Sequence, residues 1–353
     1  MKSPVSSSEK LVTSQLLGLD ERFHAAGLVR SRRGAHAGVR RVPGFEQATP
    51  EDLSPAVESP LVATNGVRLF QVPALKKHPW LWHGFTTRQG GKSRAYCAEG
   101  TDGELNLGFT AEDPRETVLQ NRQLLVEAIS GDRATPLFVV RQFHSNLIHL
   151  ARRAEVARPQ PFRADGLITT ERGLLLAIQT ADCIPVLVAD QKLRVVAAFH
   201  AGWRGTVKRI VELGVGKMRL EFRSKPENLI AAIGPGIGAC CYPVGEEVLS
   251  AFESQFAYAR GLFCEVFDSY PVRTRYPMLF LTKRAPGHSP IGPQLHLDLI
   301  EANRRQLLSA GLSPKKIHVV GGCTNCRTDL FYSHRAAQGH AGRMMSVIGI
   351  RPK

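Results

Sequence analysis

The sequence predicts a mixed α/β fold, a single layered domain in which central, mostly buried β-sheets are flanked by helices. Three observations support this prediction. Several short runs are apolar at every position, which indicates strands covered on both faces. Helix-capping patterns stand between these runs, as in layered α/β and α+β domains. With 353 residues and 43% hydrophobic content, the chain can bury a sizeable core.

The chain divides into two regions of different composition. Residues 1–60 contain a serine run at Ser6–Ser8 and six arginines without an intervening acid between Arg22 and Arg41. Apolar residues show little periodicity there, so we expect residues 1–60 to form a disordered N-terminal extension. Residues 61–353 keep a globular pattern to the end, and we expect them to form one domain.

Six runs in the second region are typical of buried strands. They are LFVV from Leu137, LLLAI from Leu174, IPVLVA from Ile184, VVAAF from Val195, LIAAI from Leu229 and IHVV from Ile317.

Helix signals lie between these runs. Asp113 is the expected cap of one helix, with Pro114 in its first turn and Glu116 as a capping-box acid. Asp298 and Glu301 repeat the device. Two further helices are expected from apolar stripes, one through Val207, Ile210, Val211 and Met218 and one through Val248, Leu249, Phe252 and Phe256.

Charge and composition limit the partners of the chain. The formal net charge of +15 favours anionic partners such as nucleotides and phosphate. No nucleic-acid module is evident, so we expect no specific nucleic-acid binding. No apolar run is long enough for a membrane helix. The seven cysteines are irregularly spaced, which is typical of reduced thiols in a cytoplasmic protein.

Three residues with metal-binding side chains stand at expected strand ends. They are His144 in RQFHSN, Cys183 in TADCIPV and His200 in AAFHAGWRG. One pair of strands separates Cys183 from His200, so their ends can meet at one rim of a sheet. Imidazole and thiolate are preferred ligands of Zn²⁺, and three protein ligands leave a position for water or substrate. The alternative is that Cys183 is a small core residue and the histidines have structural roles.

Two glycine-rich loops resemble sites for a small anionic or polar ligand. TTRQGG sets Arg88 before two glycines, so a guanidinium and backbone amides could surround an oxyanion. IGPGIGACCY follows an apolar run but lacks the dinucleotide spacing, so we expect no nicotinamide or flavin cofactor. We expect Cys240 and Cys241 of this segment to be packing residues.

Cys323 and Cys326 form the motif CTNC. This spacing occurs in halves of structural zinc sites and in redox pairs. Because the sequence contains no second CxxC, we favour structural thiols at these positions.

Several motifs together resemble those of the laccase-domain family, whose members are called multicopper polyphenol oxidases, purine nucleoside phosphorylases and peptidoglycan editing factors. The resemblance runs from about Leu69 to Ile350. It rests on TTRQGG, ELNLG, QFH, DGLIT, TADC, HAGWRGT, IGPGIGACCY and the closing GGCTNCRTDLFYSHRAAQGHAGRM. One departure is Ser145, since glycine usually follows QFH.

The resemblance implies a mononuclear zinc site formed by His144, Cys183 and His200, with copper as the alternative ion. It also implies phosphorolysis of adenosine, inosine, guanosine and methylthioadenosine, together with adenosine deamination. A cation with these ligands favours ionisation of a water molecule. Asp182 is then a candidate proton carrier for deamination.

Three further residues are candidate contacts to the nucleoside or to phosphate. A guanidinium matches two phosphate oxygens, which favours Arg88 and Arg204 as phosphate ligands. We add Asn106 of ELNLG as a substrate-binding candidate.

Three other functions are compatible with parts of the sequence. The first is hydrolysis of a wrongly incorporated amino acid from UDP-muramyl-serine, a peptidoglycan-editing reaction that also suits a zinc site. The second is copper-dependent polyphenol oxidation, which is disfavoured because no HxH motif occurs. The third is a non-enzymatic scaffold, which is disfavoured because all three expected ligands are present.

Overall fold

The computed structural model describes residues 40–41, 59–97, 103–158, 160–266 and 294–352. Most of the predicted N-terminal extension therefore lies outside the described residues, and its disorder remains a prediction. Within it, Arg40–Arg41 forms strand β1 and pairs with β13 (Phe263–Val266). Gly38–Lys353 forms one compact unit.

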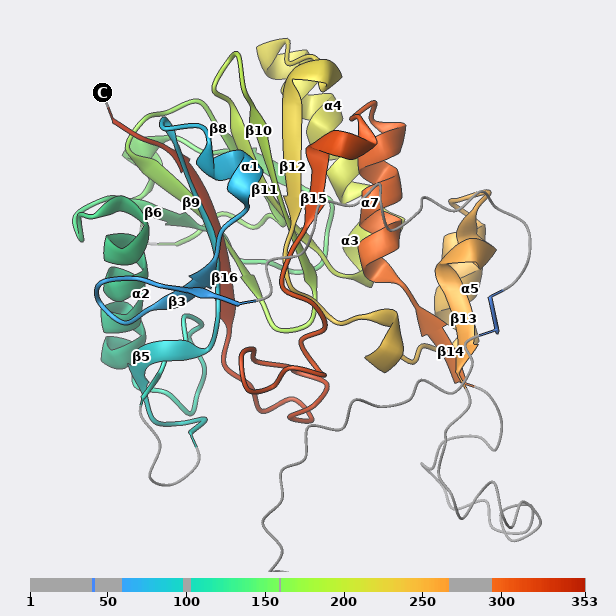
Figure 1. The fold of residues 1–353 in the computed structure, drawn as a ribbon, viewed down its shortest axis with the longest axis horizontal. Coiled ribbons are helices and arrows are strands. Elements are labelled where there is room, and N and C mark those ends of the chain that lie inside the picture. The colour runs from blue at the N-terminus through green and yellow to red at the C-terminus, as the bar shows by residue number, and fades with distance from the viewer. Residues whose placement is uncertain (1–39, 42–58, 98–102, 159, 267–293, 353) are drawn as a thin grey trace, which may run out of the picture. The chain divides into compact units, whose positions relative to one another are not determined.

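Two six-stranded sheets form the centre of this unit (Figure 1). The first sheet has the order β2 (Leu61–Val62), β3 (Arg68–Phe70), β4 (Leu81–Thr86), β16 (Met344–Ile350), β9 (Leu174–Thr180) and β6 (Leu137–Val139). The second sheet has the order β15 (Ile317–Val319), β12 (Leu229–Ile233), β10 (Ile184–Asp190), β11 (Val196–Ala201), β8 (Gly166–Thr169) and β7 (Ile148–Leu150).

The other regular elements lie around these two sheets or connect them. A small sheet joins β1, β13 and β14 (Gln294–Leu297), and β5 (Gln89–Ser93) follows β4. The α-helices of the described residues are α1 (Pro73–Lys76), α2 (Arg115–Ser130), α3 (Trp203–Val207), α4 (Ile210–Phe222), α5 (Glu246–Glu253) and α7 (Leu299–Ser309).

Three hydrophobic clusters explain why the central strands are apolar on both faces. Successive side chains of a strand point to opposite faces. In β10, Leu187 therefore packs in the cluster shared by the two sheets, whereas Val186 and Val188 pack with residues of α4 and α7. In β9 the partner layer is α2, where Ala177 packs in a cluster with Leu125. The layers run α2, first sheet, second sheet, then α4 and α7, which confirms the predicted fold class (Figure 1).

The expected strands are present, but three helix details differ from the sequence predictions. Pro114 is the N-cap of α2, because the Asp113 carboxylate instead accepts hydrogen bonds from Ser93 and Asn106. The stripe through Val207 and Met218 is split into α3 and α4, because Arg209 takes a left-handed conformation with φ 59°. Phe256 lies beyond the end of α5 at Glu253.

The predicted helix cap at Asp298 is confirmed. The Asp298 side chain caps α7 by accepting a hydrogen bond of 2.9 Å from the Glu301 amide. Among the described helices, none combines the length and the apolar character needed to cross a bilayer.

The packing of α4 on the second sheet predicts a strong effect of Gly214→Ala. A Cβ at Gly214 would lie 2.2 Å from the ring of Phe199, which is fully buried. Overpacking of this kind costs about 1–3 kcal/mol of unfolding free energy, more than the roughly 1 kcal/mol gained from better helix propensity. Urea denaturation measures the difference. Gly216→Ala in the same helix is the matched control, because its Cβ would meet no atom within 4 Å and should be neutral or stabilising.

The buried imidazole of His83 predicts a pH dependence of stability. Burial lowers the pKa of His83 to about 4, and its Nε2 accepts a hydrogen bond from the Val72 amide. As the pH falls from 6.5 to 4, the unfolded chain takes up a proton that the folded chain does not. The free energy of unfolding should therefore fall by about 3 kcal/mol over this interval. His83→Gln should lack this component in denaturation curves measured across the range, and parallel profiles of the two proteins would contradict the assignment.

Candidate metal centre

The structure brings His144, Cys183 and His200 together at one rim of the second sheet. Cys183 directly precedes β10, and His200 lies near the end of the antiparallel neighbour β11, in register with Pro185. His144 lies in the loop between β6 and β7. One ligand atom of each residue lies within 4.8 Å of the others. These three residues are called the trio below.

The trio is buried on one side and open on the other. His200 is buried, Cys183 is half-buried and His144 is exposed. The Cys183 Sγ and His144 Nε2 atoms are 3.8 Å apart, and the two imidazole rings meet edge to face with centroids 5.0 Å apart. A small ligand can therefore approach the trio from the side of His144.

The buried carboxylate of Asp165 organises the trio. Its Oδ1 lies 2.8 Å from His200 Nδ1, so the other ring nitrogen, Nε2, remains available to the trio. The same carboxylate accepts hydrogen bonds from the amides of Phe143, His144 and Ser145. Asp165 thus orients His200 and stabilises the turn that contains His144. The backbone of His144 has φ 60°.

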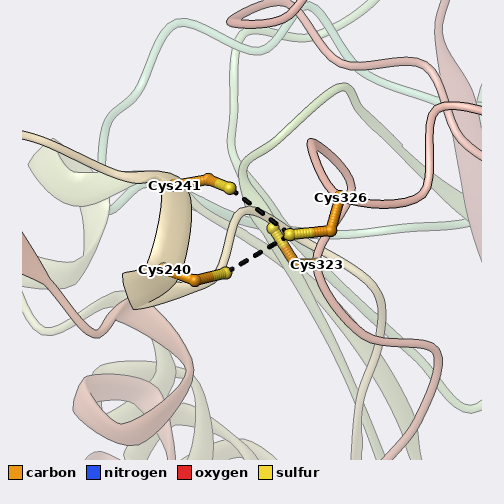
Figure 2. A group of neighbouring side chains, drawn as sticks. All are labelled: Cys240, Cys241, Cys323 and Cys326. Carbon is orange, nitrogen blue, oxygen red and sulfur yellow. Dashed lines mark hydrogen bonds between the residues drawn. The ribbon is translucent and has the colours of Figure 1, made fainter. Parts of the chain in front are cut away.

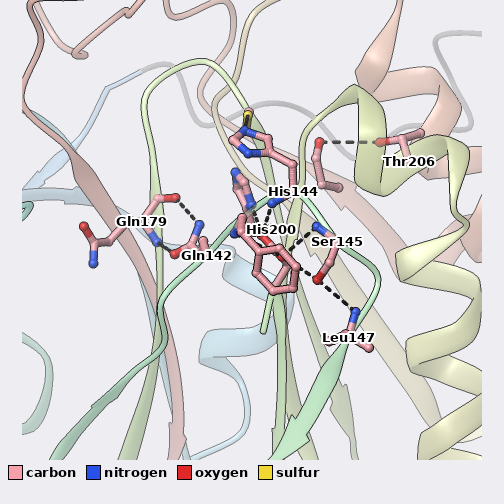
Figure 3. Close-up of polar contacts among 11 residues, drawn as sticks. Gln142, His144, Ser145, Leu147, Gln179, His200 and Thr206 are labelled. Atoms are coloured by element: carbon pink, nitrogen blue, oxygen red, sulfur yellow. Dashed lines mark hydrogen bonds and ion pairs between the residues drawn. The ribbon is translucent and has the colours of Figure 1, made fainter. Parts of the chain in front are cut away.

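Ser145, which replaces the usual glycine, contributes to this arrangement. Its hydroxyl donates a hydrogen bond of 2.7 Å to Asp165 and accepts one from the Leu147 amide. On the other side of the turn, the Gln142 side chain forms two hydrogen bonds of 2.8 Å with the backbone of Gln179 in β9. The turn is therefore held by both sheets (Figure 3).

The trio and Asp165 form a charged network. Burial raises the pKa of the Asp165 carboxyl, but hydrogen bonds from His200 and Ser145 outweigh this effect and lower the pKa to about 2. Burial likewise raises the pKa of Cys183, but the charge of His200 and hydrogen bonds from both histidines lower it to about 6. Burial lowers the pKa of His200, whereas the Cys183 thiolate and Asp165 raise it to about 9. These opposite pKa shifts favour a Cys183 thiolate paired with a protonated His200, so the thiolate is ready to bind a metal ion, whereas His200 must release its Nε2 proton when the ion binds.

The donor set fits a zinc ion. One thiolate and two imidazoles are the ligand types that Zn²⁺ prefers. A carboxylate that fixes the orientation of a ligating histidine is the usual partner in such sites, and Asp165 holds that position toward His200. His144, Cys183 and His200 would hold the ion.

Asp182 shapes the turn before Cys183. It has φ 92°, which is rare for a residue other than glycine. Its carboxylate accepts hydrogen bonds of 2.6 Å from the Thr324 hydroxyl and 2.7 Å from the Arg335 amide. Asp182 thus lies beside the trio, and its role as a proton carrier remains a prediction.

Tyr242 and Arg335 lie near the trio, although sequence reasoning did not select them: the charge of Cys183 acts on Tyr242, and the Arg335 amide binds Asp182, which directly precedes Cys183. Burial raises the pKa of Tyr242 to about 12, and the charges of Cys183, Arg335, Asp182 and Arg204 also act on it. Arg335 lies 5.3 Å from the centroid of the Tyr242 ring. Sequence reasoning did not select Asp165 either, because DGLIT contributed only to the family resemblance.

The three candidate contacts to substrate have different surroundings. Arg204 is exposed on α3, which directly follows β11, and its guanidinium covers the Trp203 ring at 4.4 Å. Arg88 pairs with Glu104 at 2.8 Å and donates to the carbonyls of Thr328 and Tyr96.

Arg88 lines a cavity of about 630 Å³ whose lining includes no member of the trio. Asn106 is fully buried, and its amide binds Gly108, Asp113 and the Arg343 backbone. The protein itself thus uses the polar groups of Asn106 and most of those of Arg88, and their substrate roles remain predictions.

The expectation that Cys240 and Cys241 are packing residues is wrong. Cys240 is exposed and Cys241 is half-buried. Their sulfurs lie within 4.8 Å of those of Cys323 and Cys326, which are distant in the chain. A second CxxC motif is not needed to bring four cysteines together. The adjacent pair Cys240 and Cys241 lies beside Cys323 and Cys326 in the folded chain.

Comparisons with known proteins agree with this fold. Residues 82–351 match the family described as multi-copper polyphenol oxidoreductase laccase, and the chain belongs to this family. A protein of Bacteroides thetaiotaomicron named purine nucleoside phosphorylase is 33% identical over 292 residues, covering 81% of this chain and 98% of the relative.

Two further matches bear on fold and chemistry. The crystal structure of the Bacillus licheniformis hypothetical protein YfiH has a TM-score of 0.67 and 28% identity, covering 84% of this chain and all of that one. A protein named adenosine deaminase RL5, from an unknown prokaryotic organism, is 32% identical over 184 residues, covering 52% of this chain and 61% of the relative.

The close approach of Gly202 to the trio predicts that Gly202→Ala weakens metal binding. A Cβ there would lie 2.8 Å from Cys183 Sγ and 2.9 Å from His144 Cδ2, so the added methyl group must displace a ligand. We expect metal affinity to fall by about 10–100-fold, as for loss of a residue that orients a ligand. Competition with a chromophoric chelator measures the affinity. Gly216→Ala should leave it unchanged, and an equal affinity of both variants would contradict the packing argument.

Proposed function

We propose that the protein is a zinc-dependent purine nucleoside phosphorylase that also deaminates adenosine. The observation that carries the proposal is the trio, two imidazoles and a thiolate within 4.8 Å of one another and open to solvent on one side. The printed names of two relatives, a purine nucleoside phosphorylase and an adenosine deaminase, support both activities. Adenosine, inosine, guanosine and methylthioadenosine are the proposed substrates.

Zinc at the trio would supply a Lewis acid next to the substrate and would favour ionisation of a water molecule. The protein contributes the orientation of the ligands, since Asp165 prevents the His200 ring from rotating. It also contributes a rim formed by strand ends, which holds the site on rigid elements.

Phosphorolysis requires phosphate on one side of the ribose and a proton for the leaving base. The bond between C1′ and the purine nitrogen breaks, and a phosphate oxygen bonds to C1′. Arg204 is our candidate for holding phosphate, and Arg335 is a second cation near the trio. Tyr242 stays protonated at neutral pH, so its hydroxyl can donate a hydrogen bond to the base.

Deamination requires addition of water at C6 of the purine and loss of ammonia. The amino group must gain a proton before it leaves. Asp182 is our candidate proton carrier because it directly precedes the ligand Cys183 in the chain. Its carboxylate accepts a hydrogen bond from the Arg335 amide.

The proposal predicts that Cys183→Ala loses the zinc ion at the trio and both activities. Loss of a direct ligand should reduce turnover by more than the roughly 100-fold typical of outer partners of a metal. Turnover is followed by chromatography of adenine and inosine formed from adenosine with and without phosphate. Cys97→Ser is the matched control, since its sulfur lies outside the trio. Wild-type rates in Cys183→Ala would refute the proposed site.

An assay of the same protein with a different substrate separates the proposed function from the alternatives. Release of serine from UDP-muramyl-serine, without phosphorolysis, would favour the peptidoglycan-editing hydrolase, for which the net charge of +15 and the trio are also suitable. The copper oxidase has less support, because the candidate metal groups among the described residues contain only two histidines.

A further inference from the structure

A second group of metal-binding side chains lies outside the trio. Cys240 and Cys241 belong to the 3₁₀ helix η4 (Ala239–Cys241), and Cys323 and Cys326 belong to the loop after β15. Figure 2 shows the four side chains converging from these two segments. The four sulfur atoms all lie within 4.8 Å of one another. These residues are called the four-cysteine group.

The spacing of the sulfurs matches a tetrahedral site. A zinc ion bound to four thiolates at 2.3 Å places neighbouring sulfurs about 3.8 Å apart. The Cys326 Sγ lies 3.6 Å from that of Cys240 and 3.4 Å from that of Cys241. A disulfide would require about 2.05 Å, and each of the four is a free cysteine.

The backbone around Cys323 is arranged for a thiolate. The amides of Gly238, Asn325 and Cys326 donate hydrogen bonds to its sulfur, the first at 3.3 Å. Donors that converge on a sulfur favour its charged form, and such outer hydrogen bonds are typical of metal ligands. Gly321, with φ 93°, and Gly322, with φ 111°, allow the chain to turn into this loop.

We propose that the four-cysteine group binds one thiophilic divalent cation, with zinc as the expected ion, separate from the metal at the trio. Binding forms four metal–sulfur bonds and releases the protons of those cysteines that are still thiols. No open coordination position remains, so the site is structural.

This site would fix the turn that presents Cys183. Thr324 stands between two of the cysteines, and its hydroxyl donates to the Asp182 carboxylate at 2.6 Å. Its amide donates to the Gly236 carbonyl at 3.0 Å. A metal that joins the two loops would therefore restrain the residue directly before the catalytic ligand.

Metal quantitation on purified, reduced protein tests the proposal. Wild type should contain two zinc ions per chain, and Cys323→Ser/Cys326→Ser should contain one. Cys183→Ala should also contain one, because it loses the ion at the trio and keeps the other. Cys97→Ser should retain two. A Cys183→Ala protein without bound metal would overturn the proposal even if the proposed function is correct.

A second test uses cobalt and does not require the Cys323→Ser/Cys326→Ser protein to fold. Cys183→Ala loaded with Co²⁺ should show intense sulfur-to-cobalt charge-transfer absorption, since the four-cysteine group is then the one intact candidate site among the described residues. Absence of this absorption would contradict the proposal. Equimolar iron and inorganic sulfide, or a disulfide among these cysteines in the reduced preparation, would also overturn it by assigning the group to different chemistry.

Discussion

The candidate site depends on one buried carboxylate. Asp165 has no exposed surface, and a charge in that position is tolerated only when hydrogen bonds surround it. The Ser145 hydroxyl, the His200 ring and three successive backbone amides supply them. The same contacts fold the turn of His144 and set the ring of His200. The need to satisfy Asp165 therefore determines how the ligands meet.

The layered core explains why this geometry can be maintained. Each central strand is covered by another sheet on one face and by helices on the other, so the strand ends at the rim have little freedom. Gly202 sits where a methyl group would collide with two members of the trio, which shows how closely β11 and α3 approach them. The open side faces solvent at His144, where a nucleoside must enter if the proposed function is correct.

The trio and the four-cysteine group are connected through short contacts. Thr324 and the Arg335 amide both bind the Asp182 carboxylate, so the C-terminal loops hold the turn before Cys183. A closed metal site at the four-cysteine group and an open one at the trio would have different roles. The closed site would restrain the backbone, and the open site would remain available for chemistry. This division would account for two groups of metal-binding side chains in a chain with a single CxxC motif.

The sequence alone determined the fold class, the strands and the three residues of the trio. Uniformly apolar runs can be stable only between two covering layers, and polar residues directly beyond such runs fall at a sheet rim. Tertiary structure decided the rest. Asp165 and Tyr242 act through neighbours that are distant in the chain, and Cys240 and Cys241 meet Cys323 and Cys326 across about 85 residues. Local spacing contains no signal for such encounters, because the folded layers create them.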